Sequence, residues 1–147
     1  MSTQAAVAIR PAQRTDSAKL ANLCTQLGYL TNESEVEQRL SEMGPERCIW
    51  LALDSTTGAT FGFIETVLVS HILSLKTLEI GALVVDESAR CQGIGQALVR
   101  WAEDYAKSTG ISKIRVRSNV TRERAHRFYE RLGYEVVKTS RVFEKTV

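Results

Sequence analysis

The first 45 residues carry apolar side chains at helical spacing behind one short extended run. Residues 7–10 are expected to form a strand. Residues 18–27 place three leucines on one helical face, and Gly28 stops that helix. Asn32 is expected to cap a second helix, which ends at Gly44. The pattern therefore predicts one strand and then two helices.

From residue 48 onward the pattern becomes extended, with apolar runs separated by polar turns. Residues 48–53 and 60–69 predict a hairpin. Residues 77–85 predict a third strand, whose nearly continuous apolar character is typical of a strand covered on both faces. Gly81 lies inside this strand and predicts a β-bulge.

In the second half of the chain, helical and extended patterns alternate. A helix is expected after Gly95, a strand over 111–118, and a short helix capped by Thr121. Residues 134–138 and 142–145 predict two last strands. The order βααβββαβαββ contains a strand–helix–strand unit, which predicts a mixed sheet with helices on both faces.

Composition narrows the class of protein. The chain has 147 residues and a net charge of +2, which fits one domain over 1–147 and gives no case for a nucleic-acid partner. Its three cysteines show neither metal-ligand nor redox-motif spacing, so we expect no metal and a reducing, cytoplasmic location. Because no apolar run approaches the roughly 20 residues of a membrane span, we expect no membrane partner.

The turn at 90–95, Arg-Cys-Gln-Gly-Ile-Gly, is the main chemical signal. Its glycines let the backbone approach a ligand, the N–H groups from Gln92 to Gln96 are not used inside the following helix, and Arg90 adds a positive charge. Leu98 occupies the third glycine position of a dinucleotide fingerprint, and a P-loop's Gly-Lys-Ser/Thr tripeptide does not occur. The turn therefore indicates a site for another phosphate-bearing ligand or an ordinary strand–helix connection.

A second segment follows one strand later, where the sequence from Ala125 to Tyr134 reads A-x-x-F-Y-x-x-x-G-Y. Together with the strand Leu83-Val84-Val85 and with R-x-x-G-x-G at the turn, in this order, it resembles the GNAT superfamily of N-acetyltransferases. The resemblance covers nearly the whole chain. It implies an α/β (mixed α+β) fold, with a mostly antiparallel central sheet of six to seven strands and about four flanking helices.

The resemblance also implies acetyl-coenzyme A as the donor. The pyrophosphate would bind the turn amides, and the pantetheine arm would pair with the strand backbone before the turn. Tyr129 would protonate the departing thiolate. The chain departs from the family's common pattern at Glu87, where proline is frequent, and at Arg122, where asparagine is frequent and Asn119 is the substitute. The implied cofactor-binding residues are Leu83, Val84, Val85, Arg90, Cys91, Gln92, Gly93, Ile94, Gly95, Gln96, Asn119, Arg124 and Phe128.

Glu79 is the predicted general base. It is a carboxylate within an otherwise apolar strand, and burial raises the pKa of a carboxylate toward a useful range. Family members often use a carboxylate on this strand through a water. Glu87, beside the turn, is the weaker alternative. Because the sequence shows no Ser/His/Asp or Cys/His arrangement, direct attack by the amine in a ternary complex is simpler than an acyl-cysteine route through Cys91.

The sequence does not identify the acceptor beyond a primary amine on a small molecule or peptide. Residues 29–31, 71–75 and 139–141 are expected to border its site. The alternative function is a non-catalytic module that binds coenzyme A as a sensor or packs onto a partner protein. The oligomeric state is open, with a homodimer among the alternatives.

Overall fold

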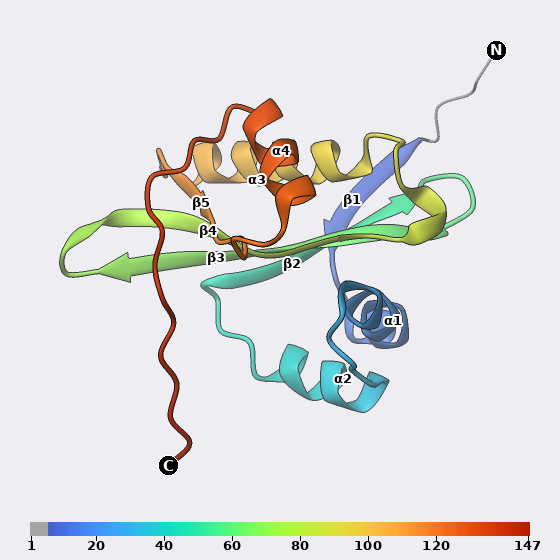
Figure 1. Ribbon diagram of the computed structural model, residues 1–147. Coiled ribbons are helices and arrows are strands. Elements are labelled where there is room, and N and C mark those ends of the chain that lie inside the picture. Colours follow the sequence, from blue (N-terminus) through green and yellow to red (C-terminus); the bar gives the residue numbers. More distant parts are fainter. Residues whose placement is uncertain (1–5) are drawn as a thin grey trace. The chain divides into compact units, whose positions relative to one another are not determined.

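The fold is built around a five-stranded sheet in which the two longest strands, β3 and β4, lie side by side (Figure 1). The computed structural model describes residues 6–147. These residues form an N-terminal unit, up to Arg117, and a C-terminal unit, from Ser118 to Val147. The whole sheet belongs to the N-terminal unit.

The strands are arranged in chain order, β1-β2-β3-β4-β5. Neighbours are antiparallel except for the last pair, in which β5 runs parallel to β4. The predicted mixed, mostly antiparallel sheet is therefore confirmed. The strands are β1 (Val7–Pro11), β2 (Arg47–Asp54), β3 (Thr60–His71), β4 (Ser74–Val85) and β5 (Ile114–Val116).

Helices cover both faces of this sheet, as predicted. Helices α1 (Ser17–Leu27) and α2 (Glu33–Ser41) lie on one face, and α3 (Ile94–Ser108) lies on the other (Figure 1). Short 3-10 turns precede α1 and α3, namely η1 (Arg14–Asp16) and η2 (Glu87–Ala89). None of the helices within residues 6–147 has the length and apolar content needed to cross a bilayer.

Local signals fix the ends of the first two helices. The Asn32 side chain accepts a hydrogen bond from the Glu35 N–H at 2.8 Å, which confirms it as the N-cap of α2. Gly28 ends α1 with a φ of 107°, a left-handed conformation that favours glycine.

Apolar side chains fill the space between the sheet and each helical layer. Beneath α1 and α2, Leu20 packs in one cluster with Phe63 and Val84. Beneath α3, the Trp50 ring meets Trp101 edge-on at a centroid distance of 5.5 Å. The two layers bury the apolar strand positions that the sequence pattern marks as core.

A β-bulge at Gly81 changes the direction in which β4 side chains point. Glu65 pairs with Ala82, but the next residue, Thr66, pairs with Ile80, so Gly81 is the extra residue on β4. The predicted bulge is confirmed. Because of it, Ile80 shares the α3 face with Thr66, and Ala82 shares the α1–α2 face with Glu65.

The C-terminal unit contains the fourth helix, α4 (Glu123–Arg131), whose N-cap is Arg122 rather than the predicted Thr121. The predicted strands over 134–138 and 142–145 are wrong: residues 6–147 contain five strands, not six or seven, and the order ends at α4. The side chains from 135 to 147 are exposed. An apolar pattern forms a strand only where a neighbouring backbone completes the ladder, and here the ladder is absent.

Candidate functional site

The connection from β4 to α3 contains two residues with positive φ and a run of backbone N–H groups without acceptors among residues 6–147. Cys91 and Gly93 adopt positive φ values of 64° and 79°. Within residues 6–147 the N–H groups from Gln92 to Gln96 make no hydrogen bond, and the Ala97 N–H is the first in α3 to reach an acceptor, the Gly93 carbonyl at 3.0 Å. Such free amides, together with the positive end of the helix dipole, favour a phosphate group.

Two residues that the sequence analysis missed hold the start of this turn. Gln26 of α1 donates to the Asp86 carboxylate at 2.8 Å and accepts from the Glu87 N–H at 3.0 Å. Hydrogen bonds from Ser88 and from Gln26 lower the pKa of Asp86, so the carboxylate stays ionised at neutral pH. No sequence signal pairs residues 60 positions apart, so only the structure shows this link.

Among the described residues of the N-terminal unit, no strand pairs with the β5-facing edge of β4 beyond the bulge. β5 pairs only with Leu78 to Ile80, whereas β4 continues to Val85. The Val85 carbonyl oxygen lies on this free edge and accepts a hydrogen bond from Arg90 Nε at 3.4 Å. Alternation along an antiparallel strand places the backbone groups of Leu83 on the same edge. An extended ligand arm could therefore add to the sheet as a strand directly before the turn.

Glu79, the predicted base, lies on β4 before the bulge and faces Arg117. Its Oε1 forms an ion pair with Arg117 Nε at 3.1 Å, and its side chain is 22% exposed. The carboxylate is thus partly buried, with a guanidinium as its partner.

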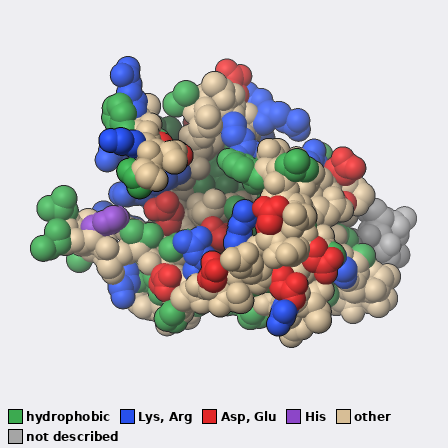
Figure 2. Space-filling view, turned by 90° about the horizontal axis from the view of Figure 1, so that it is seen from below, with side chains coloured by type: hydrophobic (Ala, Val, Ile, Leu, Met, Phe, Trp, Pro, Cys, Tyr) green, Lys and Arg blue, Asp and Glu red, His purple; other side chains and the backbone are tan. Residues whose placement is uncertain are grey.

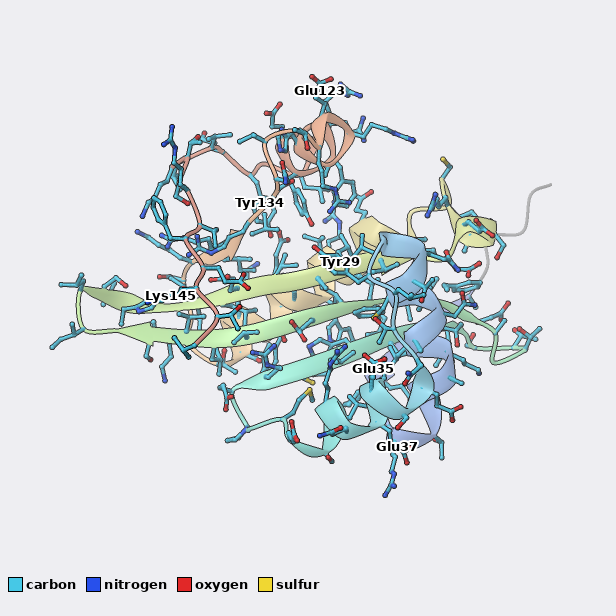
Figure 3. All side chains as sticks on the ribbon, turned by 60° about the horizontal axis from the view of Figure 1, so that its bottom comes forward. Tyr29, Glu35, Glu37, Glu123, Tyr134 and Lys145 are labelled. Atoms are coloured by element: carbon cyan, nitrogen blue, oxygen red, sulfur yellow. The ribbon has the colours of Figure 1, made fainter. Side chains whose placement is uncertain are left out.

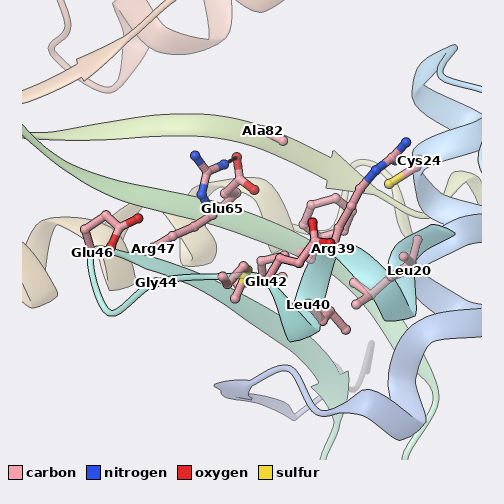
Figure 4. A pocket seen from close by; sticks show the side chains of 14 residues that line it. Leu20, Cys24, Arg39, Leu40, Glu42, Gly44, Glu46, Arg47, Glu65 and Ala82 are labelled. Atoms are coloured by element: carbon pink, nitrogen blue, oxygen red, sulfur yellow. Dashed lines mark ion pairs between the residues drawn. The ribbon is translucent and has the colours of Figure 1, made fainter.

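A second carboxylate, missed by the sequence analysis, lines a pocket of about 460 Å³ between α1, α2 and strands β2 to β4 (Figure 4). Glu65 of β3 is 20% exposed there and forms an ion pair with Arg47 of β2 at 3.2 Å. Leu20, Leu40 and Phe63 supply apolar wall. The sequence signal for Glu65 is weak, a single acidic residue in an apolar strand, because its pairing with Ala82 and its contact with Gly81 depend on how the strands align.

Neither this pocket nor the surface around it is dominated by one charge. Cys24 lies in the pocket wall, and burial raises the pKa of its thiol, which keeps it protonated. Acidic and basic side chains are interspersed on the molecular face shown in Figure 2.

Among residues 6–147, no group of three or more His, Cys, Asp or Glu side chains is placed to hold a metal ion.

In the C-terminal unit, Tyr129 of α4 lies within an aromatic cluster. Its ring meets Phe128 at 5.1 Å and Tyr134 at 5.8 Å, both edge-on. Burial raises the pKa of Tyr129 above its ordinary value, against a smaller lowering effect of Arg122. The phenol is therefore protonated at neutral pH, as an acid must be.

Asn119 and Arg124 are both exposed in this unit. The Asn119 side chain accepts from the Thr121 N–H at 3.0 Å and from its hydroxyl at 2.9 Å. Its backbone carbonyl contacts a ring nitrogen of His126 at 2.9 Å. Asn119 therefore orders the approach to α4, and it lies three residues beyond β5, which is shorter than the strand expected over 111–118.

A comparison with known protein families identifies the family to which this chain belongs. The sequence profile of the acetyltransferase (GNAT) family matches residues 18–134. The chain belongs to the GNAT family. Among curated relatives, an aminoalkylphosphonate N-acetyltransferase of Salmonella typhimurium is 44% identical over 57 residues, which is 39% of this chain and 37% of that protein. The matched stretches cover 30% to 49% of the three curated relatives, so the chain spans about half of their length or less.

Solved structures support the GNAT fold. A transcriptional regulator from Bacillus halodurans superposes with a TM-score of 0.85 at 20% identity, over 95% of this chain and 100% of the other. An aminoglycoside 6′-N-acetyltransferase from Acinetobacter baumannii superposes with a TM-score of 0.82 at 16% identity, over 97% and 99%. Proteins described so differently share this fold, so the fold alone does not select a substrate.

Proposed function

We propose that this GNAT protein transfers an acetyl group from acetyl-coenzyme A to a primary amine of a small molecule or peptide, in a direct ternary-complex reaction. The observation that carries the proposal is the turn after β4, where five consecutive N–H groups, Gln92 to Gln96, are free. They follow a strand whose outer edge is also free. Together they match a ligand with a pyrophosphate at one end and an extended amide-bearing arm.

The chain's own groups would hold the donor. The backbone N–H groups of the turn from Cys91 to Gln96 would donate hydrogen bonds to the pyrophosphate, with Arg90 turning from the Val85 carbonyl to a phosphate. The backbone of Leu83, Val84 and Val85 would pair with the pantetheine arm. Family resemblance alone supports the roles of the three remaining proposed contacts in the C-terminal unit, namely Asn119, Arg124 and Phe128.

An alkylamine must lose a proton before it attacks. With an ordinary pKa near 10.4, only about one amine in a thousand or fewer is neutral at pH 7. Glu79 is the proposed base, acting through a water, and a strand N–H near Val85 would stabilise the oxyanion. The donor supplies the acetyl group as a thioester.

The proton and bond changes balance within one transfer step. The amine nitrogen bonds to the acetyl carbonyl carbon and gives a proton to the base, while the carbon–sulfur bond breaks. Tyr129 is the proposed acid that gives a proton to the sulfur. Its raised pKa supports this role, because the phenol carries its proton at neutral pH.

The family match spans residues 18–134 and so includes parts of both units, which supports our proposal that the chain is a single N-acetyltransferase domain. We also propose a cytoplasmic protein without a metal, a membrane or a nucleic acid as partner. A homodimer is one arrangement to be tested by light scattering.

The test has two stages. Calorimetric titration with acetyl-coenzyme A, with adenosine as the control ligand, should show binding of the former alone. A free-thiol release assay across amino acids, aminoalkylphosphonates, polyamines, aminoglycosides and peptides should then identify acceptors. Absence of binding contradicts the proposed donor. Binding without thiol release by any amine would favour the sensor or interaction module.

A further inference from the structure

We propose, building on the acetyl transfer proposed above, that the acceptor is a zwitterion: a small primary amine that also bears an anionic group. It would bind in the α1–α2 pocket by exchanging partners with the Arg47–Glu65 ion pair. The amine would take Glu65, and the anionic group would take Arg47.

The position of the pocket suits an acceptor. Ala82 lines the pocket, and the backbone groups of the next residue, Leu83, lie on the unpaired edge of β4 proposed for the donor's arm. Glu65 is the pairing partner of Ala82, so an amine bound at Glu65 lies on the strand next to β4. Glu79 is not part of the pocket lining, so Glu65 is the half-buried carboxylate that an amine in the pocket would meet.

The charges inside the pocket favour a ligand that carries both signs. Arg47 and Glu65 are 40% and 20% exposed and lie 3.2 Å apart against apolar wall (Figure 4). A ligand with only a cationic amine would take Glu65 and leave the guanidinium of Arg47, which is 40% exposed, with water in place of its ion-pair partner. A zwitterion supplies a new partner to each side chain.

The other charged groups around the pocket do not offer the same exchange. Arg39 forms an ion pair at 3.2 Å with Glu35, one turn earlier on α2. Glu35 is labelled on this helix in Figure 3. Glu42 and Glu46 also line the pocket, but neither belongs to an ion pair among residues 6–147, so neither offers two opposite charges to a ligand. The pocket volume of about 460 Å³ fits a small molecule.

The experiment compares matched acceptors at saturating acetyl-coenzyme A. The probes are ω-amino acids and ω-aminophosphonates with two to four carbons between the groups, each beside an uncharged counterpart, the amide or the alcohol. We expect the best zwitterion to exceed its counterpart in kcat/KM by about tenfold to a hundredfold, the scale of a charge-assisted hydrogen bond. Arg47→Gln should remove this preference, and Arg47→Lys should restore part of it.

Further variants keep the result interpretable. Glu65→Gln should lower kcat/KM for every amine, and the double variant Arg47→Gln/Glu65→Gln removes both charges without leaving either one unpaired. Arg14→Gln is the matched control, because it removes the Arg14–Glu37 ion pair, whose members do not line the pocket. Far-ultraviolet circular dichroism checks the folding of each variant.

The outcomes separate the two proposals. Equal turnover of zwitterions and uncharged amines, or an unchanged preference in Arg47→Gln, overturns the zwitterion inference and leaves acetyl transfer standing. Thiol release only with peptides overturns it as well. If no acceptor releases thiol, the proposed function fails. Calorimetric titration with the zwitterions then tests whether the pocket binds them. Zwitterion binding to the wild type but not to Arg47→Gln supports the inference, and no binding to either overturns it.

Discussion

Gly81 of β4 lies against the carboxylate of Glu65 on β3, so closely that a Cβ built on Gly81 would overlap Glu65 Oε1. The absent side chain at 81 is therefore what allows Glu65 to reach its observed position beside Arg47. These two residues therefore link the β-bulge in the backbone of β4 to the charged pocket.

Gly81→Ala should disturb the pocket much more than the fold. The overlapping atom is the end of a flexible side chain, which can move, so we expect the free energy of unfolding to change by less than about 1 kcal/mol. KM for the acceptor should rise by about tenfold, because the displaced carboxylate loses its charge-assisted contact. Urea unfolding and steady-state kinetics measure the two effects. In a Glu65→Gln background Gly81→Ala should add little, and an equal loss there would contradict the coupling.

Gly93→Ala should weaken acetyl-coenzyme A binding. Gly93 has a φ of 79° with open space where a Cβ would stand, so the change strains the backbone of the turn without a clash. Gly58 of the β2–β3 connection is a matched control, with a φ of 76° and equally open space. We expect both variants to lose about 1 kcal/mol of stability. Only Gly93→Ala should raise the calorimetric Kd, and equal Kd values would remove the turn from the donor site.

Tyr129→Phe should lower kcat by about tenfold to a hundredfold, as for the loss of a general acid, and leave the Kd of acetyl-coenzyme A unchanged. The aromatic cluster keeps its ring, so the fold should persist. Because burial raises the pKa of Tyr129, the wild type should not lose activity through this group at any pH below about 10. Tyr105→Phe, on α3, is the control, and an unchanged kcat in Tyr129→Phe would exclude the acid role.

Asp16→Asn should destabilise the N-terminal unit by about 2–3 kcal/mol. The buried carboxylate accepts two hydrogen bonds from Arg10, at 2.8 and 3.0 Å, and one from the Gln13 N–H at 2.7 Å. Glu35→Gln, which breaks an exposed ion pair, is the control and should cost less than about 1 kcal/mol.

The effect of Asp16 should also depend on pH. The hydrogen bonds from Arg10 lower the pKa of Asp16 below its unfolded value. Its contribution is therefore complete above about pH 5 and declines as the pH falls through the folded pKa. Urea unfolding of the wild type and of Asp16→Asn should converge in acid, and a constant difference down to pH 2 would contradict this assignment.

Much of the fold could be predicted because its signals are local. Asn32 and Gly28 act through their own helix ends, and the bulge is indicated by a glycine inside an apolar strand. The turn after β4 could be located for the same reason, since free amides follow from the start of any helix. The positive φ of Cys91 could not be predicted, because cysteine has no preference for the left-handed conformation.

The parts that sequence reasoning missed depend on partners distant in the chain. Gln26 reaches Asp86, and Glu65 reaches Arg47, through tertiary packing that no short pattern encodes. The strands expected after residue 133 are an error of the opposite kind, because the sequence pattern predicted elements that the structure does not contain. Their apolar residues suggested a ladder, but a ladder needs a neighbouring backbone as well as suitable side chains.

The bulge has a further consequence for how β4 tolerates change. Leu78 and Ile80 face α3, whereas Ala82 and Val84 face α1, although all four positions are even-numbered. Deleting residue 81 would restore regular alternation and move Ala82 and Val84 to the opposite face of the sheet. Val84 would then leave its core cluster, and Ala82 would leave the pocket wall. A substitution along this strand changes one side chain in its place. The loss of residue 81 would move every following side chain of β4, as far as the turn, to the opposite face of the sheet.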